Sequence, residues 1–192
     1  MRGIVVAMEC EAQAVRPHLQ DGDRLYISGI GKVNAAAATQ KAISDGADEI
    51  INVGVAGGFE SEVEIFGVYE IARAVEYDFD LSEVNGTSKG VHDERDTPYF
   101  ALHTKGVFPP KTLGTGDKFG DGEDDLPLLK SLGVGVRDME GAAIAHVCEK
   151  SSVRLRSLKC ITNIVGRGST ESYAENLKRA LECLRNALTS WM

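Results

Sequence analysis

The chain lacks an excess of basic residues. Lysine and arginine together number 21 against 29 aspartates and glutamates, which gives a net charge of -8 and a pI near 5.0. Nucleic acids and anionic membrane surfaces are bound through clusters of positive charge. We therefore expect neither a nucleic acid nor a membrane as a partner of this protein.

Paired cysteines and clustered histidines are also missing. The four cysteines (positions 10, 148, 160 and 183) form no CxxC pair and have no metal-ligand spacing. The four histidines (18, 92, 103 and 146) are scattered. His146 lies in an alanine-rich segment, where a lone histidine is more often a packing residue than a ligand. This pattern favours reduced thiols in a cytoplasmic protein and predicts no metal and no cofactor.

No apolar stretch approaches the length of a membrane-spanning helix. Glu9 and Glu11 interrupt the apolar run at the start of the sequence, so we expect no signal peptide. A length of 192 residues is typical of one domain with a single core, which we expect to comprise residues 1–192.

Strand-like and helix-like segments alternate along the chain. Apolar, β-branched runs predict strands at 3–7, 24–28, 50–53, 68–75, 111–115 and 155–162. Helical periodicity predicts helices at 9–19, 33–44, 140–150 and 173–190, the last with leucines at helical spacing. Residues 82–98 are polar and rich in turn formers, which indicates a loop. The alternation predicts an α/β fold with a mixed or partly closed sheet.

Two carboxylates stand at the start of the predicted helix at 140–150. Asp138 and Glu140 flank Met139 and follow a strand-like run, Leu132-Gly-Val-Gly-Val136. A buried carboxylate needs a partner, and a ligand rich in hydroxyl groups would supply one, so Glu140 is a candidate for substrate binding. An exposed acid favoured by the helix dipole is the alternative, and it suits Asp138 better.

Two glycine clusters follow predicted strands. Gly29-Ile-Gly-Lys-Val-Asn34 lacks the spacing of a nucleotide P-loop, and Gly54-Val-Ala-Gly-Gly58 lacks the dinucleotide-binding pattern. In an α/β sheet both clusters would lie at the carboxyl edge, where ligands bind and where small residues such as Ala56 and Gly57 allow close approach to the backbone. Tight turns without a ligand are the alternative.

Five segments, taken together, resemble the purine nucleosidase/phosphorylase family, and most closely its methylthioadenosine/S-adenosylhomocysteine nucleosidases. They occur in the family's order and are spread over nearly the whole chain. The resemblance implies a three-layer α/β fold with a central twisted, partly barrel-like mixed sheet flanked by helices. The segments are Ala7-Met-Glu-Cys-Glu11, Ser28-Gly-Ile-Gly-Lys32, Asn52-Val-Gly-Val-Ala-Gly-Gly58, Thr115-Gly-Asp-Lys-Phe119 and Asp138-Met-Glu-Gly-Ala-Ala-Ile-Ala-His146.

The resemblance implies hydrolysis of the N-glycosidic bond of a purine nucleoside, through a transition state with positive charge on the ribose. Glu11 matches the family's general base, which activates water. Glu140 matches the carboxylate that binds the ribose 2'-hydroxyl, and Met139 would pack against the sugar. Phe119 matches the aromatic residue that stacks on the purine. Further pocket-lining candidates are Met8, Ile30, Ala56 and Gly57.

The sequence departs from the family at Asn163, where the nucleosidases have the aspartate that acts as general acid on the purine. An amide supplies no proton in this way, but it can donate one hydrogen bond and accept another. That pairing suits a 6-oxopurine, as in futalosine hydrolases, better than adenine. Val55 also stands where the hydrolases have a serine that helps to hold the water. With both features changed, a nucleoside-binding protein without catalysis is a further alternative.

A second departure concerns phosphate. Phosphorylase relatives bind phosphate with an arginine and a hydroxyl group, where this chain has Asn52 and Val55. Neither neutralises a phosphate dianion. The retained Glu11 therefore favours water as the nucleophile over a phosphate-dependent purine nucleoside phosphorylase reaction.

The family also closes its substrate pocket with loops of a neighbouring subunit, which implies a homodimer. In this chain the apolar residues available for that role lie in the divergent stretch 82–110. They are Val84, Tyr99, Phe100 and Phe108.

Overall fold

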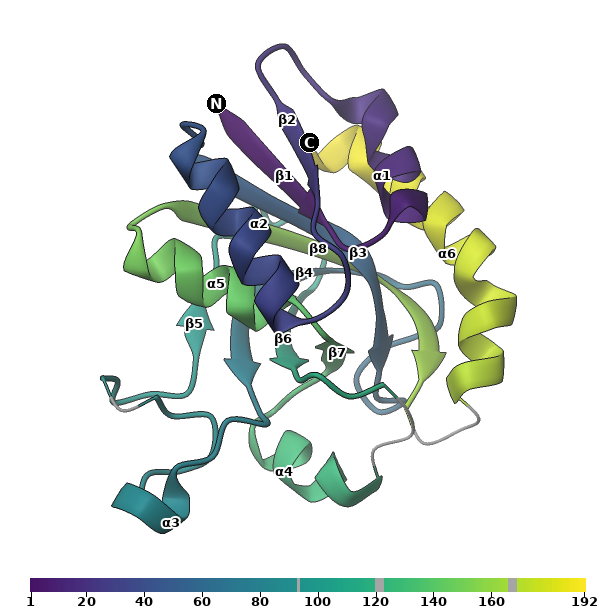
Figure 1. Cartoon of the computed structure of the whole chain (residues 1–192). Coiled ribbons are helices and arrows are strands. Elements are labelled where there is room, and N and C mark those ends of the chain that lie inside the picture. Colours follow the sequence, from purple (N-terminus) through teal and green to yellow (C-terminus); the bar gives the residue numbers. More distant parts are fainter. Residues whose placement is uncertain (93, 120–122, 166–168) are drawn as a thin grey trace.

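The computed structural model describes residues 1–92, 94–119, 123–165 and 169–192 (Figure 1). Its strands are β1 (Arg2–Val6), β2 (Arg24–Ile27), β3 (Glu49–Gly58), β4 (Val68–Glu76), β5 (Phe100–Ala101), β6 (Pro110–Thr115), β7 (Val136–Asp138) and β8 (Arg154–Ile164). Its α-helices are α1 (Glu9–Val15), α2 (Lys32–Ser44), α3 (Ser82–Asn85), α4 (Leu126–Ser131), α5 (Gly141–Lys150) and α6 (Ser169–Trp191). Two 3-10 turns occur at Arg16–His18 and Glu123–Asp125.

Every strand and helix predicted from the sequence is present, although several ends differ. Of the strand-like run at 132–136, only Val136 belongs to a strand, because β7 comprises Val136–Asp138. Short elements were missed, namely α4, the two-residue strand β5, and the single helical turn α3 inside the predicted loop at 82–98. These elements are too short for a hydrophobic period to develop in the sequence.

Five strands close into a ring. β3 pairs with β8, β8 with β4, β4 with β6, β6 with β7, and β7 again with β3. β1 and β2 extend the sheet from β3, and β5 extends it from β4. Parallel and antiparallel pairs both occur, so the expected mixed, partly barrel-like sheet is confirmed.

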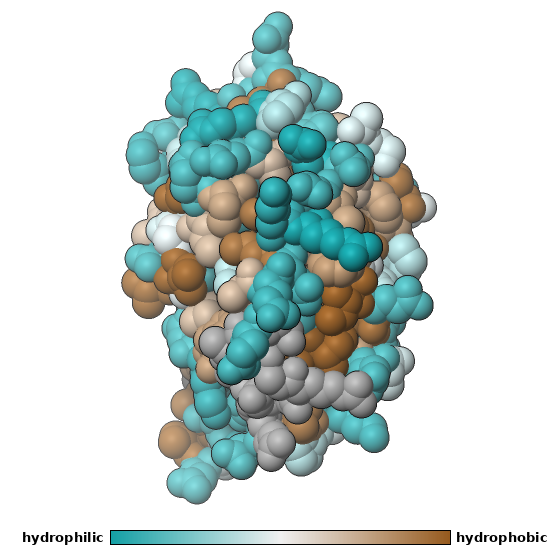
Figure 2. All heavy atoms as spheres, turned by 90° about the vertical axis from the view of Figure 1, so that its right-hand side faces the viewer, coloured by the Kyte–Doolittle hydropathy of each residue, from teal (hydrophilic) through white to brown (hydrophobic). Residues whose placement is uncertain are grey.

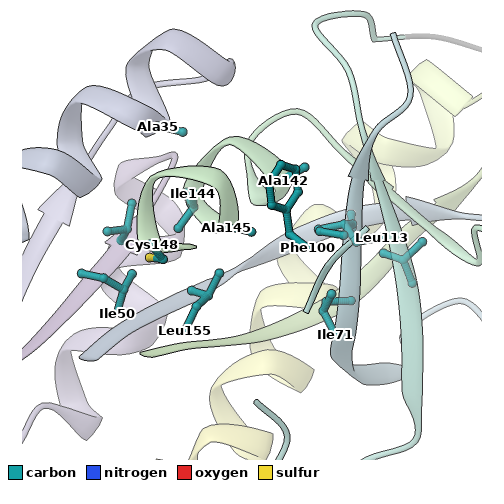
Figure 3. Close-up of a cluster of buried hydrophobic side chains, with 14 of the residues drawn as sticks. Ala35, Ile50, Ile71, Phe100, Leu113, Ala142, Ile144, Ala145, Cys148 and Leu155 are labelled. Atoms are coloured by element: carbon teal, nitrogen blue, oxygen red, sulfur yellow. The ribbon is translucent and has the colours of Figure 1, made fainter. Parts of the chain in front are cut away.

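Helices cover the sheet in two layers. In Figure 1, α2 and α5 lie on one side and α1 and α6 on the other. The core under α5 is drawn in Figure 3, where Cys148 and Ile144 of the helix lie over the strand residues Ile50 and Leu155. The close packing of α5 follows from its alanines, which let the helix backbone approach the sheet.

The helix α6 is amphipathic, as its leucine spacing predicts. Leu184, Leu188 and Trp191 are buried in the second core cluster and Ala187 packs against it, while the other positions between them are exposed. The face of the molecule that carries α6 is accordingly mostly hydrophilic, with a brown hydrophobic area at the right (Figure 2). Among the described residues no helix combines the length and the hydrophobicity needed to cross a membrane.

The pairing of β3 with β8 contains a β-bulge. Ala56 is opposite Ile161, but the next residue, Gly57, is opposite Asn163, so Thr162 is the extra residue. Successive residues of a regular strand point to opposite faces, whereas a bulge redirects one of them. Thr162 and Asn163 consequently line the same pocket.

Candidate active site

A pocket opens where β1, β3, β7 and β8 end and α1 and α5 begin. This is the carboxyl edge at which α/β sheets bind ligands. All nine site residues proposed from the sequence line it, and so do several that were not proposed. The predicted residues are Met8, Glu11, Ile30, Ala56, Gly57, Phe119, Met139, Glu140 and Asn163; the additional ones include Lys118, Arg137, Thr162 and Tyr173.

Backbone N–H groups hold the carboxylate of Glu11 in the first turn of α1. Oε2 accepts hydrogen bonds from the N–H groups of Ala7 (2.9 Å) and Met8 (3.0 Å), and Oε1 accepts one from Val55 (2.9 Å). Gly54 leaves room for this carboxylate, because a Cβ at that position would lie 2.6 Å from Oε1. Glu11 is thus fixed between β1 and β3 with 2% of its surface exposed.

Glu140 is the residue immediately before α5, and its carboxylate faces the loop that precedes α2. Oε1 accepts a hydrogen bond from the backbone N–H of Gly31 at 2.8 Å. Gly31 has φ +100°, a left-handed conformation that favours glycine, so the glycine cluster at 29–34 supplies this contact. Glu140 therefore joins two of the segments that resemble the nucleosidase family.

Asp138 ends β7 and is buried, which corrects its interpretation as an exposed acid. Its carboxylate accepts hydrogen bonds from the N–H groups of Glu140 and Gly141 and from the hydroxyl of Thr115 (2.6 Å). It does stabilise the start of α5, as a helix-start acid should. Its burial is possible because Nζ of Lys159 lies 2.9 Å from Oδ2.

Lys159, a residue not proposed from the sequence, lies behind the pocket on β8. Its side chain is 3% exposed, and its charge acts on Asp138, Glu140 and Glu11. Burial alone would lower the pKa of Lys159, but these three carboxylates raise it. One ammonium group thus faces three carboxylates, which gives the base of the pocket an excess of negative charge when all are ionised.

Burial raises the pKa of both pocket glutamates. For Glu11, desolvation outweighs the opposing effects of Lys159 and of the three backbone N–H groups. For Glu140, desolvation and the adjacent charge of Asp138 raise the pKa to about 7, against the effects of Lys159 and Gly31. A pKa of about 7 lets Glu140 exchange protons near neutral pH, and raised pKa values are common among acid–base residues.

The raised pKa of Glu140 predicts that a Glu140→Gln variant is more stable than the parent protein at pH 8. The folded protein binds the Glu140 carboxyl proton more tightly than the unfolded chain does. The stability that this proton contributes is therefore lost as pH rises from about 4.5 to about 7. The neutral amide avoids this loss and keeps an oxygen for Gly31. We expect a gain on the order of 2–3 kcal/mol at pH 8 and little at pH 4 in urea unfolding. An equal change at both pH values would contradict the assignment.

Asn163 lies 5% exposed at the end of the bulge, and its neighbour Thr162 orients it. The Thr162 hydroxyl lies 2.8 Å from Oδ1 of Asn163 and 3.1 Å from the carbonyl oxygen of Ala56. Donation to Oδ1, the nearer oxygen, leaves the Nδ2 group of Asn163 to donate toward the pocket. Gly57 allows this approach, because a Cβ there would lie 3.2 Å from Nδ2.

Aromatic and apolar side chains form the mouth of the pocket. Phe119 is 51% exposed and meets Tyr173 of α6 edge to face, with ring centroids 5.5 Å apart. The Tyr173 hydroxyl in turn contacts the sulfur of Met8 at 3.5 Å. Ile30 is 53% exposed beside them, so it is a wall of the pocket and not part of the core. Tyr173 carried no signal in the sequence beyond its place in an amphipathic helix.

Three of the four candidates for closing a neighbouring pocket have other roles. Phe100 is 1% exposed and stacks on His146. Tyr99 donates its hydroxyl to the carbonyl of Leu132, and Phe108 packs against the second core cluster. Val84, 82% exposed on α3, is the one of the four that is free to contact another molecule.

The two residues at the phosphate-binding positions of the phosphorylases differ in location. Asn52 is buried away from the pocket, where it donates to the carbonyl of Val5 and accepts from the hydroxyl of Ser157. Val55 does line the pocket, and its N–H is already used by Glu11. Neither residue offers positive charge to an anion.

Comparison with known proteins agrees with this geometry. The model of the phosphorylase superfamily matches residues 19–190. A 5'-methylthioadenosine/S-adenosylhomocysteine nucleosidase of Marinomonas sp. (strain MWYL1) is 32% identical over 174 residues, covering 82% of this chain and 75% of that protein.

Solved structures share the fold. The nucleosidase of Colwellia psychrerythraea 34H, determined in complex with adenine, superimposes with a TM-score of 0.86 at 25% identity, covering 98% of this chain and 94% of that one. Futalosine hydrolase of Helicobacter pylori strain 26695 has a TM-score of 0.88 at 21% identity, covering 98% and 95%. From its sequence match, its fold and its pocket, the chain belongs to the phosphorylase superfamily.

Proposed function

We propose that this protein hydrolyses the N-glycosidic bond of a purine nucleoside and releases the base and a ribose derivative. The observation that carries the proposal is the pair Glu11 and Glu140, two buried carboxylates that line one pocket and share the charge of Lys159. The 32% identical relative from Marinomonas is a nucleosidase, which supports the same reaction class.

The carboxylates at the base of the pocket suit the transition state of this reaction. Cleavage of the glycosidic bond leaves positive charge on the ribose ring. Glu140, whose free oxygen can accept a hydrogen bond from a ribose hydroxyl, would stabilise that charge from close range. Met139, next to Glu140 in the lining, offers an apolar surface for the sugar. The ground-state nucleoside is neutral at the ribose, so the stabilisation is selective for the transition state.

Glu11 would then take a proton from the attacking water. Its carboxylate is fixed by three N–H groups, so it need not reorganise, and its raised pKa makes it a stronger base than an exposed glutamate. Hydrolysis is favoured over phosphorolysis because Asn52 is internally hydrogen-bonded and Val55 is apolar. The reaction should therefore not depend on added phosphate.

The purine base of the substrate would contact Asn163, Phe119 and Tyr173. Phe119 provides a ring face for stacking. The Nδ2 group of Asn163 would donate a hydrogen bond to the base, but an amide cannot protonate the leaving purine as an acid does. This favours a 6-oxopurine nucleoside, as a futalosine-type substrate carries, over an adenine nucleoside that depends on protonation to leave. The matched test is Asn163→Asp.

One substrate panel tests these assignments. Purified protein is incubated with methylthioadenosine, S-adenosylhomocysteine, inosine and futalosine, with and without phosphate, and the products are identified. We expect release of hypoxanthine without phosphate dependence, and a shift toward adenine release in Asn163→Asp. Faster adenine release by the parent protein would overturn the base assignment, and ribose 1-phosphate would overturn hydrolysis. Binding that raises the melting temperature with no cleavage would make this a nucleoside-binding protein.

We also propose that the protein is a cytoplasmic homodimer. All four cysteines are free, as a reducing compartment allows. Beside the pocket, Ile30 is 53% and Val33 is 80% exposed, and large apolar side chains grouped in this way are typical of an interface. Sedimentation should therefore give twice the monomer mass, and Val33→Glu should reduce it to the monomer mass. A monomeric parent protein would refute the dimer.

A further inference from the structure

A second cluster of polar side chains lies outside the pocket, at the end of β4. Glu76 is the last residue of β4, His92 lies in the following loop, and His146 belongs to α5. Glu76 and His92 are each 8% exposed. We call these three residues the His–His–Glu cluster. The sequence separates its members widely, so no motif could reveal it.

The three side chains place ligand atoms close together. Oε1 of Glu76 lies 3.7 Å from Nε2 of His92 and 3.4 Å from Nδ1 of His146. One ligand atom from each residue lies within 4.8 Å of the other two. Two ligands of a tetrahedral zinc ion, each about 2.0–2.1 Å from the metal, are separated by about 3.4 Å. The observed spacing therefore fits one ion with small side-chain movements.

Surrounding rings hold both imidazoles in position. His92 stacks on Phe79 with ring centroids 3.9 Å apart and an angle of 14°. His146 stacks on Phe100 with centroids 4.9 Å apart. Nε2 of His92 is buried and has no hydrogen-bond partner among the described residues. A buried polar atom without a partner carries a free-energy cost that a metal ion would remove.

The two oxygens of Glu76 have different neighbours, and Oε1 is the one that faces the imidazoles. Lys32 approaches the other oxygen, Oε2, at 3.5 Å, and it is also bound to Asp78 at 2.7 Å. On the far side of His146, Oε1 of Glu94 lies 3.6 Å from Nε2. The two atoms are too far apart for a hydrogen bond, so Nε2 of His146, like Nε2 of His92, has no hydrogen-bond partner among the described residues. Lys150 pairs with Glu94 at 2.7 Å, and Arg95 pairs with Glu149.

We propose that the His–His–Glu cluster binds one divalent transition-metal ion of the zinc class. Nε2 of His92, Nδ1 of His146 and Oε1 of Glu76 would be the protein ligands, with water completing a tetrahedron. Imidazole nitrogen with one carboxylate suits such ions better than magnesium or calcium, which prefer oxygen alone. The ion would fasten the loop after β4 to α5.

The direct test is metal binding by the chelator-treated protein. Zn²⁺ is titrated by calorimetry, and Co²⁺ is titrated by visible absorption, where a four-coordinate site gives intense bands. We expect one ion per chain. Substitution of a ligand, His92→Gln or the isosteric Glu76→Gln, should weaken binding by at least about tenfold. His103→Gln, which changes an exposed histidine outside the cluster, should leave affinity unchanged.

Three results would overturn the proposal. The first is the absence of saturable binding of either ion by the parent protein. The second is binding that persists in both His92→Gln and Glu76→Gln. The third is a cobalt–thiolate charge-transfer band, which would place the ion at a cysteine. Because the readout is metal binding, failure here leaves the proposed hydrolase activity unaffected.

Discussion

A Glu11→Gln variant is expected to lose activity by about 10²–10⁴-fold in kcat, the usual contribution of a general base. Glutamine cannot accept a proton from water. The amide also meets three backbone N–H donors at positions that two carboxylate oxygens now occupy, so its NH₂ group opposes at least one of them. Glu140 and Phe119 are unchanged, and we therefore expect KM to change far less than kcat.

Glu9→Gln is the matched control for this experiment. Glu9 lies on the same helix, two residues earlier, but it is exposed and pairs with Arg16. Its substitution removes the same charge from the first turn of α1 without touching the pocket. Steady-state kinetics of both variants separate catalysis from helix stability. If Glu11→Gln retained activity within a few-fold of the parent protein, Glu11 would not be the base.

Lys159→Met is expected to destabilise the protein by about 3–5 kcal/mol, the cost of breaking a buried ion pair from one side. Removing the ammonium leaves Asp138 buried without its 2.9 Å partner and takes away the charge that balances Glu11 and Glu140. The loss should be greater at pH 8 than at pH 5, because Glu140 with a pKa of about 7 is protonated at the lower pH. Urea unfolding at the two pH values measures both effects.

Two further variants test whether the loss of stability in Lys159→Met comes from the buried ion pair. Lys41→Met removes a lysine from an exposed pair with Asp45 on α2, and we expect a loss of no more than about 0.5 kcal/mol. Adding Asp138→Asn to Lys159→Met removes the unbalanced charge, so the double variant should recover part of the stability. An effect of Lys159→Met no larger than that of Lys41→Met would mean that the pocket carboxylates do not depend on this lysine.

The sequence predicts the sheet because apolar residues recur in its strands, and it predicts the pocket because glycines and acids mark the strand ends. The sequence analysis did not identify Lys159 as a site residue. It stands in the buried strand β8, where a lysine is expected only if acids meet it, and those acids come from α1, β7 and the residue before α5. The signal was a lysine between the apolar residues Leu158 and Cys160, but its partners are visible only in three dimensions.

Asp138 and His92 illustrate the same limit. Helix-dipole reasoning correctly expected the Asp138 carboxylate to bond the start of α5, but the residue itself ends β7, and its burial depends on Lys159 and Thr115 from other strands. His92 and His146 were expected to be isolated, and they lie with ring centroids 4.5 Å apart. Local patterns determine which element a residue belongs to, whereas its neighbours across the sheet depend on strand order and register.

If Asn163 contacts the base as proposed, the bulge at Thr162 allows the base preference to change while the barrel stays intact. Because the extra residue turns Asn163 into the pocket, the pair of side chains at 162 and 163 can change without altering the hydrogen-bonded register of β3 and β8 on either side. A lineage could therefore exchange amide, acid or hydroxyl at this point and acquire a different nucleobase preference in a single step. The same property makes these two positions the natural starting point for engineering the enzyme toward new nucleosides.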